Sequence, residues 1–195
     1  MEIKMDRRVK KTKQALQNAY IDLTEKYRSD EITVLMIAQY ADLNRATFYA
    51  HYSNKEEFLK ESLCELLEGF RIAILAPFED SSQINVNSLA PTTIQIFDYI
   101  EKNKRIFYAM YTSHADFEKL MKEFFYEVFT TDIILEMHSN LGEIRYEMFL
   151  HYQSNATLGL IFFWIQGDFQ YTAQYMMEQL TIFSNTQVLN LRKSQ

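Results

Sequence analysis

Hydrogen-bonding side chains gather between residues 45 and 55, and a small side chain lies among them. An arginine can donate two hydrogen bonds to a guanine edge, whereas threonine, tyrosine, histidine and lysine can donate to phosphate oxygens. An alanine lets a helix enter a major groove closely. This combination favours a surface that reads duplex DNA. Its members are Arg45, Ala46, Thr47, Tyr49, His51 and Lys55.

Two short helices joined by a tight turn are predicted to position these side chains. Thr33 and Asn44 are N-cap residue types, and each precedes apolar residues at helical spacing. Asp42 lies in the turn, where we expect a left-handed backbone that Asp tolerates better than most residues other than glycine. Phe48 and Tyr52 are expected to face inward together. The pattern is typical of a helix-turn-helix motif.

A longer helix is predicted to follow the motif. Ser53 and Glu56 have the spacing of a capping box, and Lys55 falls in the first turn. Backbone N–H groups and a lysine at a helix start suit a phosphate. The alternative is that the capped pair is an ordinary helical hairpin in a bundle, because periodicity alone does not specify DNA binding.

The charge distribution favours the DNA-binding interpretation. Residues 1–60 contain 11 Lys and Arg against 9 Asp and Glu, whereas residues 61–195 contain 9 against 17. A solvated tail is the alternative explanation for a basic N-terminus, but this one adjoins the predicted motif. Six of the first thirteen residues are basic: Lys4, Arg7, Arg8, Lys10, Lys11 and Lys13.

The segment ITVLMIAQYADLNRATFYAHYSNKEEFL, residues 32–59, resembles the TetR family of bacterial transcriptional regulators. The likeness lies in the threonine-capped helix, the T-F-Y-x-H-Y helix and the S-N-K-E-E-F-L opening. Asp42 stands where the family has glycine, and Tyr52 where it usually has phenylalanine. The resemblance implies that Arg45, Ala46 and Thr47 contact base edges. It also implies that Thr33, Tyr49, His51 and Lys55 hold phosphates.

The remaining sequence predicts an all-α chain of two domains, a helix-turn-helix domain at 1–53 and a helical regulatory and dimerisation domain at 54–195. Four glycines and two prolines leave little material for a turn-rich β fold. Cys64 is expected to be a buried structural thiol on an apolar helix stripe. Helices are expected at about 8–27, 54–75, 115–138, 144–166 and 173–189, with two more in 91–111 broken near Asn103 and a polar loop at 77–91.

The segments DYIEKNKRIFYAMY and QSNATLGLIFFWIQGDFQYTAQYMMEQL resemble the regulatory domain of TetR relatives akin to the dihydroxyacetone kinase gene activator. The resemblance implies a homodimer through the last two helices and a palindromic operator. Two-fold symmetry would also double the base pairs read, although the apolar stretch 158–165 suits a monomer core equally well. We expect a repressor controlled by a small-molecule effector. An activator or a protein-controlled regulator is the alternative.

Enzyme classes find no support in the sequence. There is no Glu-x-x-His pair for a di-metal bundle, no P-loop, no dinucleotide-binding glycine pattern and no CxxC. Glu147 and His151 make one i, i+4 pair, which is more simply a surface hydrogen bond. No cofactor, metal or membrane partner is expected, and no apolar run approaches the roughly 20 residues of a membrane span. We therefore expect a cytoplasmic protein.

Overall fold

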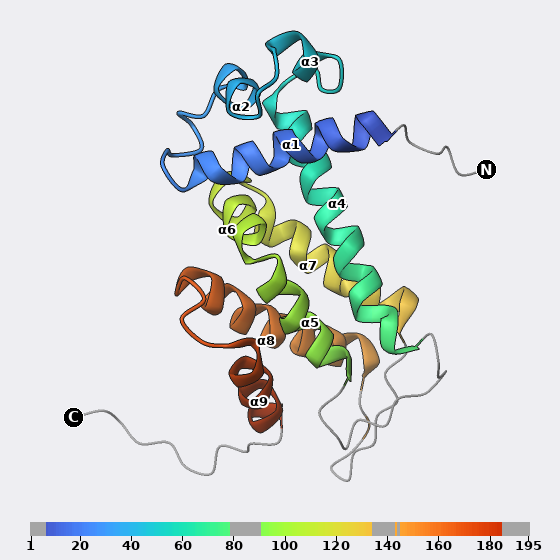
Figure 1. The fold of residues 1–195 in the computed structure, drawn as a ribbon. Helices are drawn as coiled ribbons and strands as arrows, with labels where there is room; N and C mark the ends of the chain where they lie inside the picture. The colour runs from blue at the N-terminus through green and yellow to red at the C-terminus, as the bar shows by residue number, and fades with distance from the viewer. Residues whose placement is uncertain (1–6, 79–90, 134–142, 144, 185–195) are drawn as a thin grey trace. The chain divides into compact units, whose positions relative to one another are not determined.

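The computed structural model describes residues 7–78, 91–133, 143 and 145–184, and every regular element in these ranges is helical (Figure 1). A 3₁₀ turn, Ala76–Phe78, follows α4, and a π-helical turn, Val128–Asp132, follows α7. The α-helices are α1 (Arg7–Thr24), α2 (Val34–Tyr40), α3 (Arg45–Tyr49), α4 (Lys55–Leu75), α5 (Pro91–Lys102), α6 (Lys104–Ser113), α7 (Phe117–Glu127), α8 (Tyr146–Gln166) and α9 (Ala173–Ser184).

The chain divides into two compact units. Unit 1 comprises the described residues up to Gly69 together with Arg105–Leu120, and unit 2 comprises Phe70–Lys104 and the described residues from Met121 onward. The first unit therefore contains a segment from the middle of the chain, Arg105–Leu120, together with the three N-terminal helices. The predicted domain boundary after residue 53 stays a prediction.

The predicted caps of the helix-turn-helix motif are confirmed. The hydroxyl of Thr33 accepts the N–H of Met36 at 3.2 Å, and the amide oxygen of Asn44 accepts the N–H of Thr47 at 2.8 Å. Each bond satisfies one of the N–H groups that a helix start leaves without a partner inside the helix. Asp42 has φ 55°, so the turn uses the left-handed conformation that was expected there.

The capping box of α4 lies one residue later than the sequence analysis predicted. Asn54, not Ser53, accepts the N–H of the residue three positions on, Glu57, at 2.8 Å. The Glu57 carboxylate in turn accepts the N–H of Ser53 at 2.6 Å, and this bond lowers the pKa of Glu57. The sequence SNKEE offers two adjacent cap residues and two adjacent glutamates, so spacing alone fits both registers.

An aromatic cluster joins α1, α3 and α4 in unit 1. The fully buried ring of Phe58 lies 5.7 Å from Tyr20, 5.7 Å from Phe48 and 5.2 Å from Tyr52, measured between ring centroids. Phe48 and Tyr52 also contact each other, as predicted. Pairs at such distances add a specific geometry to the burial of large apolar area. The cluster therefore holds α3 against the helices beneath it.

Arg105, near the start of α6, connects the segment Arg105–Leu120 to α1. Its guanidinium lies 2.5 Å from the Asp22 carboxylate and 2.8 Å from that of Glu25. Because these side chains are substantially exposed, the pairs contribute little free energy each. They fix where α6 meets the end of α1.

Unit 2 has its own aromatic core. Phe70 stacks on Tyr99 and Phe124 at 5.2 and 5.5 Å between centroids. The buried Trp164 of α8 contacts Phe97 at 5.7 Å, and its indole N–H donates to the carbonyl of Tyr171 at 2.9 Å. Within this unit α9 packs on both α5 and α8.

Several predicted elements are confirmed and others corrected. The break near Asn103 separates α5 from α6, and the break after Gln166 separates α8 from α9. The long helix predicted over 115–138 is wrong in extent, because α7 passes into the π-helical turn and Ile133 is extended. The predicted loop at 77–91 is too long at both ends, because residues 77 and 78 belong to the 3₁₀ turn and Pro91 begins α5. The rest of this loop, the predicted break near 140–142 and the chain beyond 184 lie outside the described residues.

The prediction of a buried thiol at Cys64 is wrong, because the side chain is exposed. On α4 the buried stripe runs through Leu63, Leu66 and Phe70, and Cys64 lies one residue off that stripe. A one-residue step rotates a side chain by about 100° around a helix.

None of the described helices is both long and apolar enough to cross a membrane.

Replacing Phe58 by Ala should lower the free energy of unfolding by about 3–5 kcal/mol, because the change leaves a cavity among three aromatic rings. Urea denaturation followed by circular dichroism measures the loss. Tyr27→Ala is the matched control: Tyr27 is 47% exposed, and its removal should change stability by no more than about 0.5 kcal/mol. Equal effects of the two variants would contradict the role given to Phe58.

Substitutions at Asp42 test the left-handed turn. Asp42→Gly should be neutral or raise the free energy of unfolding by up to about 1 kcal/mol, because glycine adopts positive φ without steric cost. Asp42→Val should lower it by about 1–3 kcal/mol, since a β-branched residue is strained there. Thermal unfolding of both variants decides the matter. A valine variant as stable as the glycine variant would show that the turn does not need this conformation.

Candidate nucleic-acid interface

Helix α3 presents one face to solvent and buries the other. Arg45, Ala46 and Tyr49 are exposed and Thr47 is partly exposed, whereas Phe48 is fully buried in the aromatic cluster. This five-residue helix is held by Phe48 and its N-cap rather than by its own length, since short isolated helices are marginal in water. The predicted base-contacting residues therefore lie together on one short, rigidly supported element.

Arg45 extends along α3 toward Tyr49. One of its guanidinium nitrogens donates to the Tyr49 hydroxyl at 3.1 Å, and the guanidinium lies 5.2 Å from the centre of the Tyr49 ring. Cation–π contact and the i, i+4 spacing restrict the rotamers of the arginine. Its remaining N–H donors can still point outward, because guanidinium carries five.

Thr47 uses its hydroxyl proton inside the motif. The hydroxyl donates to the amide oxygen of Asn44 at 3.0 Å, and that oxygen also accepts the Thr47 N–H. The outward chemistry of Thr47 is therefore a methyl group and hydroxyl lone pairs, which suits a thymine methyl or a base amino group.

Thr33 and His51 lie at opposite ends of the motif. Thr33 is exposed, and its hydroxyl acts as the acceptor in the α2 cap, which leaves the hydroxyl proton for donation. His51 follows α3 and is partly exposed, with its ring 6.3 Å from that of Tyr52. Both residues have the donor chemistry that a phosphate contact requires.

Lys55 is placed differently from the other predicted contacts. Its ammonium donates to the carbonyl oxygens of Ser29 at 2.7 Å and Ile32 at 2.9 Å. The side chain is partly buried against the α1–α2 loop. Sequence reasoning missed these partners because they lie 26 and 23 residues earlier in the chain and have no local signal.

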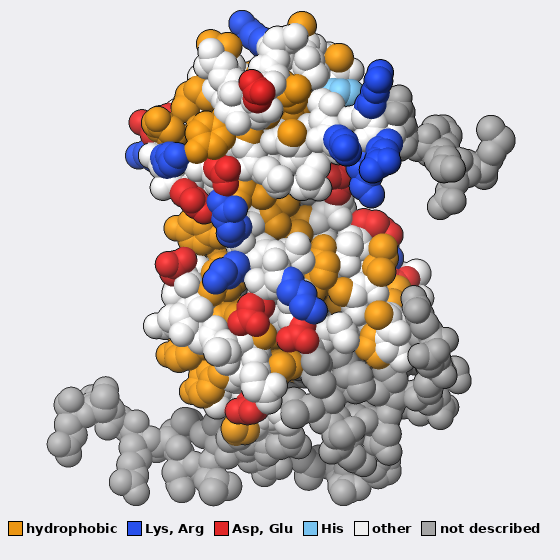
Figure 2. Space-filling model, viewed as in Figure 1, with side chains coloured by type: hydrophobic (Ala, Val, Ile, Leu, Met, Phe, Trp, Pro, Cys, Tyr) orange, Lys and Arg blue, Asp and Glu red, His pale blue; other side chains and the backbone are white. Residues whose placement is uncertain are grey.

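Basic side chains surround the start of α1. Figure 2 shows Lys and Arg side chains gathered over this end of α1, on the visible face of the molecule. Arg7, Lys10 and Lys11 are exposed, whereas Lys13 is partly buried and ion-paired with Glu61. Lys4 lies outside the described residues. Positive charge beside a helix-turn-helix motif attracts the phosphate backbone without regard to sequence.

No cluster of three or more metal-ligating side chains occurs within the described ranges. Glu147 and His151, the pair that the sequence places one helical turn apart, lie on α8, where the His151 ring stacks on Tyr126 at 4.9 Å. The imidazole therefore packs on a neighbouring aromatic ring.

Solved structures show the same fold. A TetR regulator from Streptococcus agalactiae 2603V is 21% identical with a TM-score of 0.62, covering 91% of this chain and 96% of that one. The dihydroxyacetone kinase operon activator DhaS is 18% identical with a TM-score of 0.60, covering 88% and 93%. NalD, a repressor of an efflux pump in Pseudomonas aeruginosa, is 17% identical with a TM-score of 0.57, covering 89% and 95%.

Sequence comparison identifies both parts of the chain. A curated relative, the HTH-type transcriptional regulator YxbF of Bacillus subtilis (strain 168), is 23% identical over 154 residues, which are 78% of this chain but only 39% of YxbF. Residues 30–62 match the model of bacterial regulatory proteins of the TetR family, and residues 87–186 match that of a transcriptional regulator C-terminal region. The chain therefore belongs to the TetR family of DNA-binding, non-enzymatic transcription regulators.

Proposed function

We propose that the protein is a repressor that binds an inverted-repeat operator as a homodimer and is released by a small-molecule effector. The main support for DNA reading is the outward face of α3. It carries Arg45, Ala46 and Thr47, whereas Phe48 of the same helix is buried. Arg45 is the side chain assigned to a guanine edge, because its guanidinium is oriented by Tyr49 and keeps further donors. A short helix fixed from beneath can enter a major groove with little reorganisation.

The proposed phosphate contacts frame this face. Thr33 at the start of α2, Tyr49 on α3 and His51 after it offer donors to the sugar-phosphate backbone. Lys55 stays the fourth predicted phosphate contact: two of its N–H donors bind backbone carbonyls of the α1–α2 loop, and the third remains for an anion.

Helix α8 carries an exposed apolar stripe that supports the homodimer. Met148 is 67% exposed, Tyr152 70% and Phe163 51%, and the three lie at helical spacing on one side of α8. Exposed large apolar side chains in a row mark an interaction surface rather than a monomer surface. A second copy is the natural occupant, because a two-fold pair of α3 helices doubles the contact with DNA.

Gly159 lies within this stripe, facing open space among the described residues. A Cβ atom added there would meet nothing within 4 Å, although glycine inside a helix costs about 1 kcal/mol relative to alanine. Close approach of a second helix explains the missing side chain. The rest of the apolar stretch 158–165 is mostly monomer core, since Leu158, Ile161, Trp164 and Ile165 are buried.

Aromatic rings continue the surface toward α9. Phe163 stacks with Tyr171 at 6.3 Å, and Tyr171 stacks with Tyr175 at 5.0 Å. Ile182 and Phe183, near the end of α9, are each more than half exposed. We propose that α8 and α9 of two copies bury these side chains together.

Arg45→Ala should abolish discrimination at one base pair of each half-site, a loss of about 1–3 kcal/mol, because a bidentate contact to guanine is removed. Fluorescence anisotropy measures the affinity for a bound duplex and for single-base variants of it. Lys122→Ala is the charge-matched control, since Lys122 is exposed on α7.

The two variants give opposite expectations for sequence dependence. The control should retain both affinity and base preference. An Arg45→Ala protein that keeps the full preference at every position would exclude Arg45 from base reading, and retained affinity in both variants would contradict the proposed interface.

Gly159→Leu should convert the homodimer to monomer, because the new side chain blocks the approach of the second α8 without a clash inside the protomer. Sedimentation velocity measures the oligomeric state, and thermal unfolding at high dilution checks the protomer. Ile72→Glu is the control: Ile72 is 59% exposed on α4, and its change should leave the dimer intact. A Gly159→Leu protein that stays dimeric would exclude this stripe as the interface.

Transcription in vitro from a promoter that carries a duplex bound by the protein separates repression from activation. Purified protein should reduce transcript yield. An increase in yield would favour the alternative, an activator that needs a partner rather than an inducer.

A further inference from the structure

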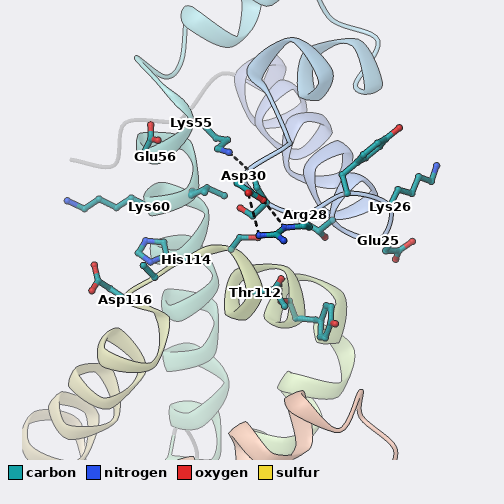
Figure 3. A pocket seen from close by; sticks show the side chains of 17 residues that line it. Glu25, Lys26, Arg28, Asp30, Lys55, Glu56, Lys60, Thr112, His114 and Asp116 are labelled. Atoms are coloured by element: carbon teal, nitrogen blue, oxygen red, sulfur yellow. Dashed lines mark hydrogen bonds and ion pairs between the residues drawn. The ribbon is translucent and has the colours of Figure 1, made fainter.

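A cavity of about 1050 Å³ lies within unit 1, and no residue of α3 lines it. Its walls come from the α1–α2 loop, the first turns of α4, and the end of α6 with the turn that follows (Figure 3). Segments from three parts of the sequence therefore meet around one hollow.

The charged side chains that line the cavity differ in their exposure to solvent. Every carboxylate that lines it belongs to an exposed side chain: Glu25, Asp30, Glu56 and Asp116. Among the charged lining residues, Lys55 is the one whose side chain is partly buried. The partly buried part of the lining therefore carries the charge of Lys55, while the exposed rim carries both signs, because Lys26, Arg28 and Lys60 lie there with the four carboxylates.

The ammonium of Lys55 is hydrogen-bonded, but no carboxylate among the described residues neutralises its charge. Its two hydrogen bonds go to carbonyl oxygens, which carry no net charge, and no carboxylate is ion-paired with it in the described part of the chain. An ammonium has three N–H donors, so one remains after these two bonds. A partly desolvated cation of this kind attracts an anion more strongly than a surface lysine does.

A polar group of the partly buried part supplies a further donor. The hydroxyl of Ser29 lies 3.2 Å from that of the buried Tyr20. The exposed rings of Tyr27 and Tyr108 provide flat apolar walls.

We propose that this cavity is an effector site for a small organic anion, a carboxylate or a phosphomonoester, with its charged group against Lys55 and Ser29. The organic part of the ligand lies between the tyrosine walls.

Occupation of the site would bear on α3 through the chain itself. Lys55 is the first residue of α4, which follows α3 after a short connection, and it holds the loop that leads to α2. An anion that draws on this ammonium therefore biases the positions of both helices of the motif. Coupling of this kind is reciprocal, so DNA must change anion affinity by the same factor. This regulatory half of the inference rests on the proposed function, whereas anion binding does not.

Calorimetric titration of the full chain without DNA tests the site. Phenyl phosphate and benzoate are the two anionic probes, benzyl alcohol is the uncharged analogue, and chloride keeps the ionic strength constant. At least one anion should bind saturably, and benzyl alcohol should bind about tenfold more weakly or not at all. The relative strength of the two anions distinguishes phosphomonoester from carboxylate recognition.

Three variants locate the bound anion. Lys55→Gln should weaken it about tenfold, whereas Lys122→Gln should leave it unchanged. Thr112→Trp fills the cavity from an exposed lining position and should abolish binding while every cavity charge is kept. Because Thr112 is exposed, that variant tests the site even if the change at Lys55 unfolds the protein. The site is overturned if neither anion binds saturably, or if anion binding survives Thr112→Trp.

A second titration measures duplex affinity with and without the bound anion. Wild-type affinity should change at least threefold, and that of Thr112→Trp should not change. Anion binding with no change in duplex affinity overturns the regulatory half alone. Failure of the anion-free protein to bind any duplex contradicts the proposed function instead and leaves the calorimetric result standing.

Discussion

The packing of Phe58 against Phe48 is the contact on which the reading surface depends. Helix α3 has five residues and does not hold itself together, so its orientation comes from the ring that it buries. Phe58 belongs to α4 and also meets Tyr20 of α1. One side chain thus fixes three helices and, through them, the positions of the exposed Arg45 and the partly exposed Thr47 of α3.

The proposed effector cavity borders helices of the same unit. The segment Arg105–Leu120 belongs to unit 1 by its contacts, although it lies in the half of the sequence that matches the regulatory region. Arg105 joins it to α1 through two carboxylates, and His114 brings it to the cavity beside Lys55. A ligand in this cavity would therefore act on helices that share one core.

Local signals made the motif predictable from the sequence. The caps at Thr33 and Asn44, the left-handed Asp42 and the inward pair of Phe48 and Tyr52 each depend on residues within a few positions, and each is confirmed. The register of the α4 cap was wrong because neighbouring residues satisfy the same spacing. Long-range contacts, such as Lys55 with the α1–α2 loop, leave no trace in local spacing. The DNA contacts assigned to individual residues stay predictions.

Selection of bound duplexes from a random pool by the purified protein tests the central claim most directly, which is that outward side chains of α3 read base edges. The account predicts enrichment of an inverted repeat whose two half-sites are centred about one helical turn apart, or a multiple of that distance. A pool that stays random after repeated rounds at low ionic strength, or that converges on a motif without two-fold symmetry, would contradict it.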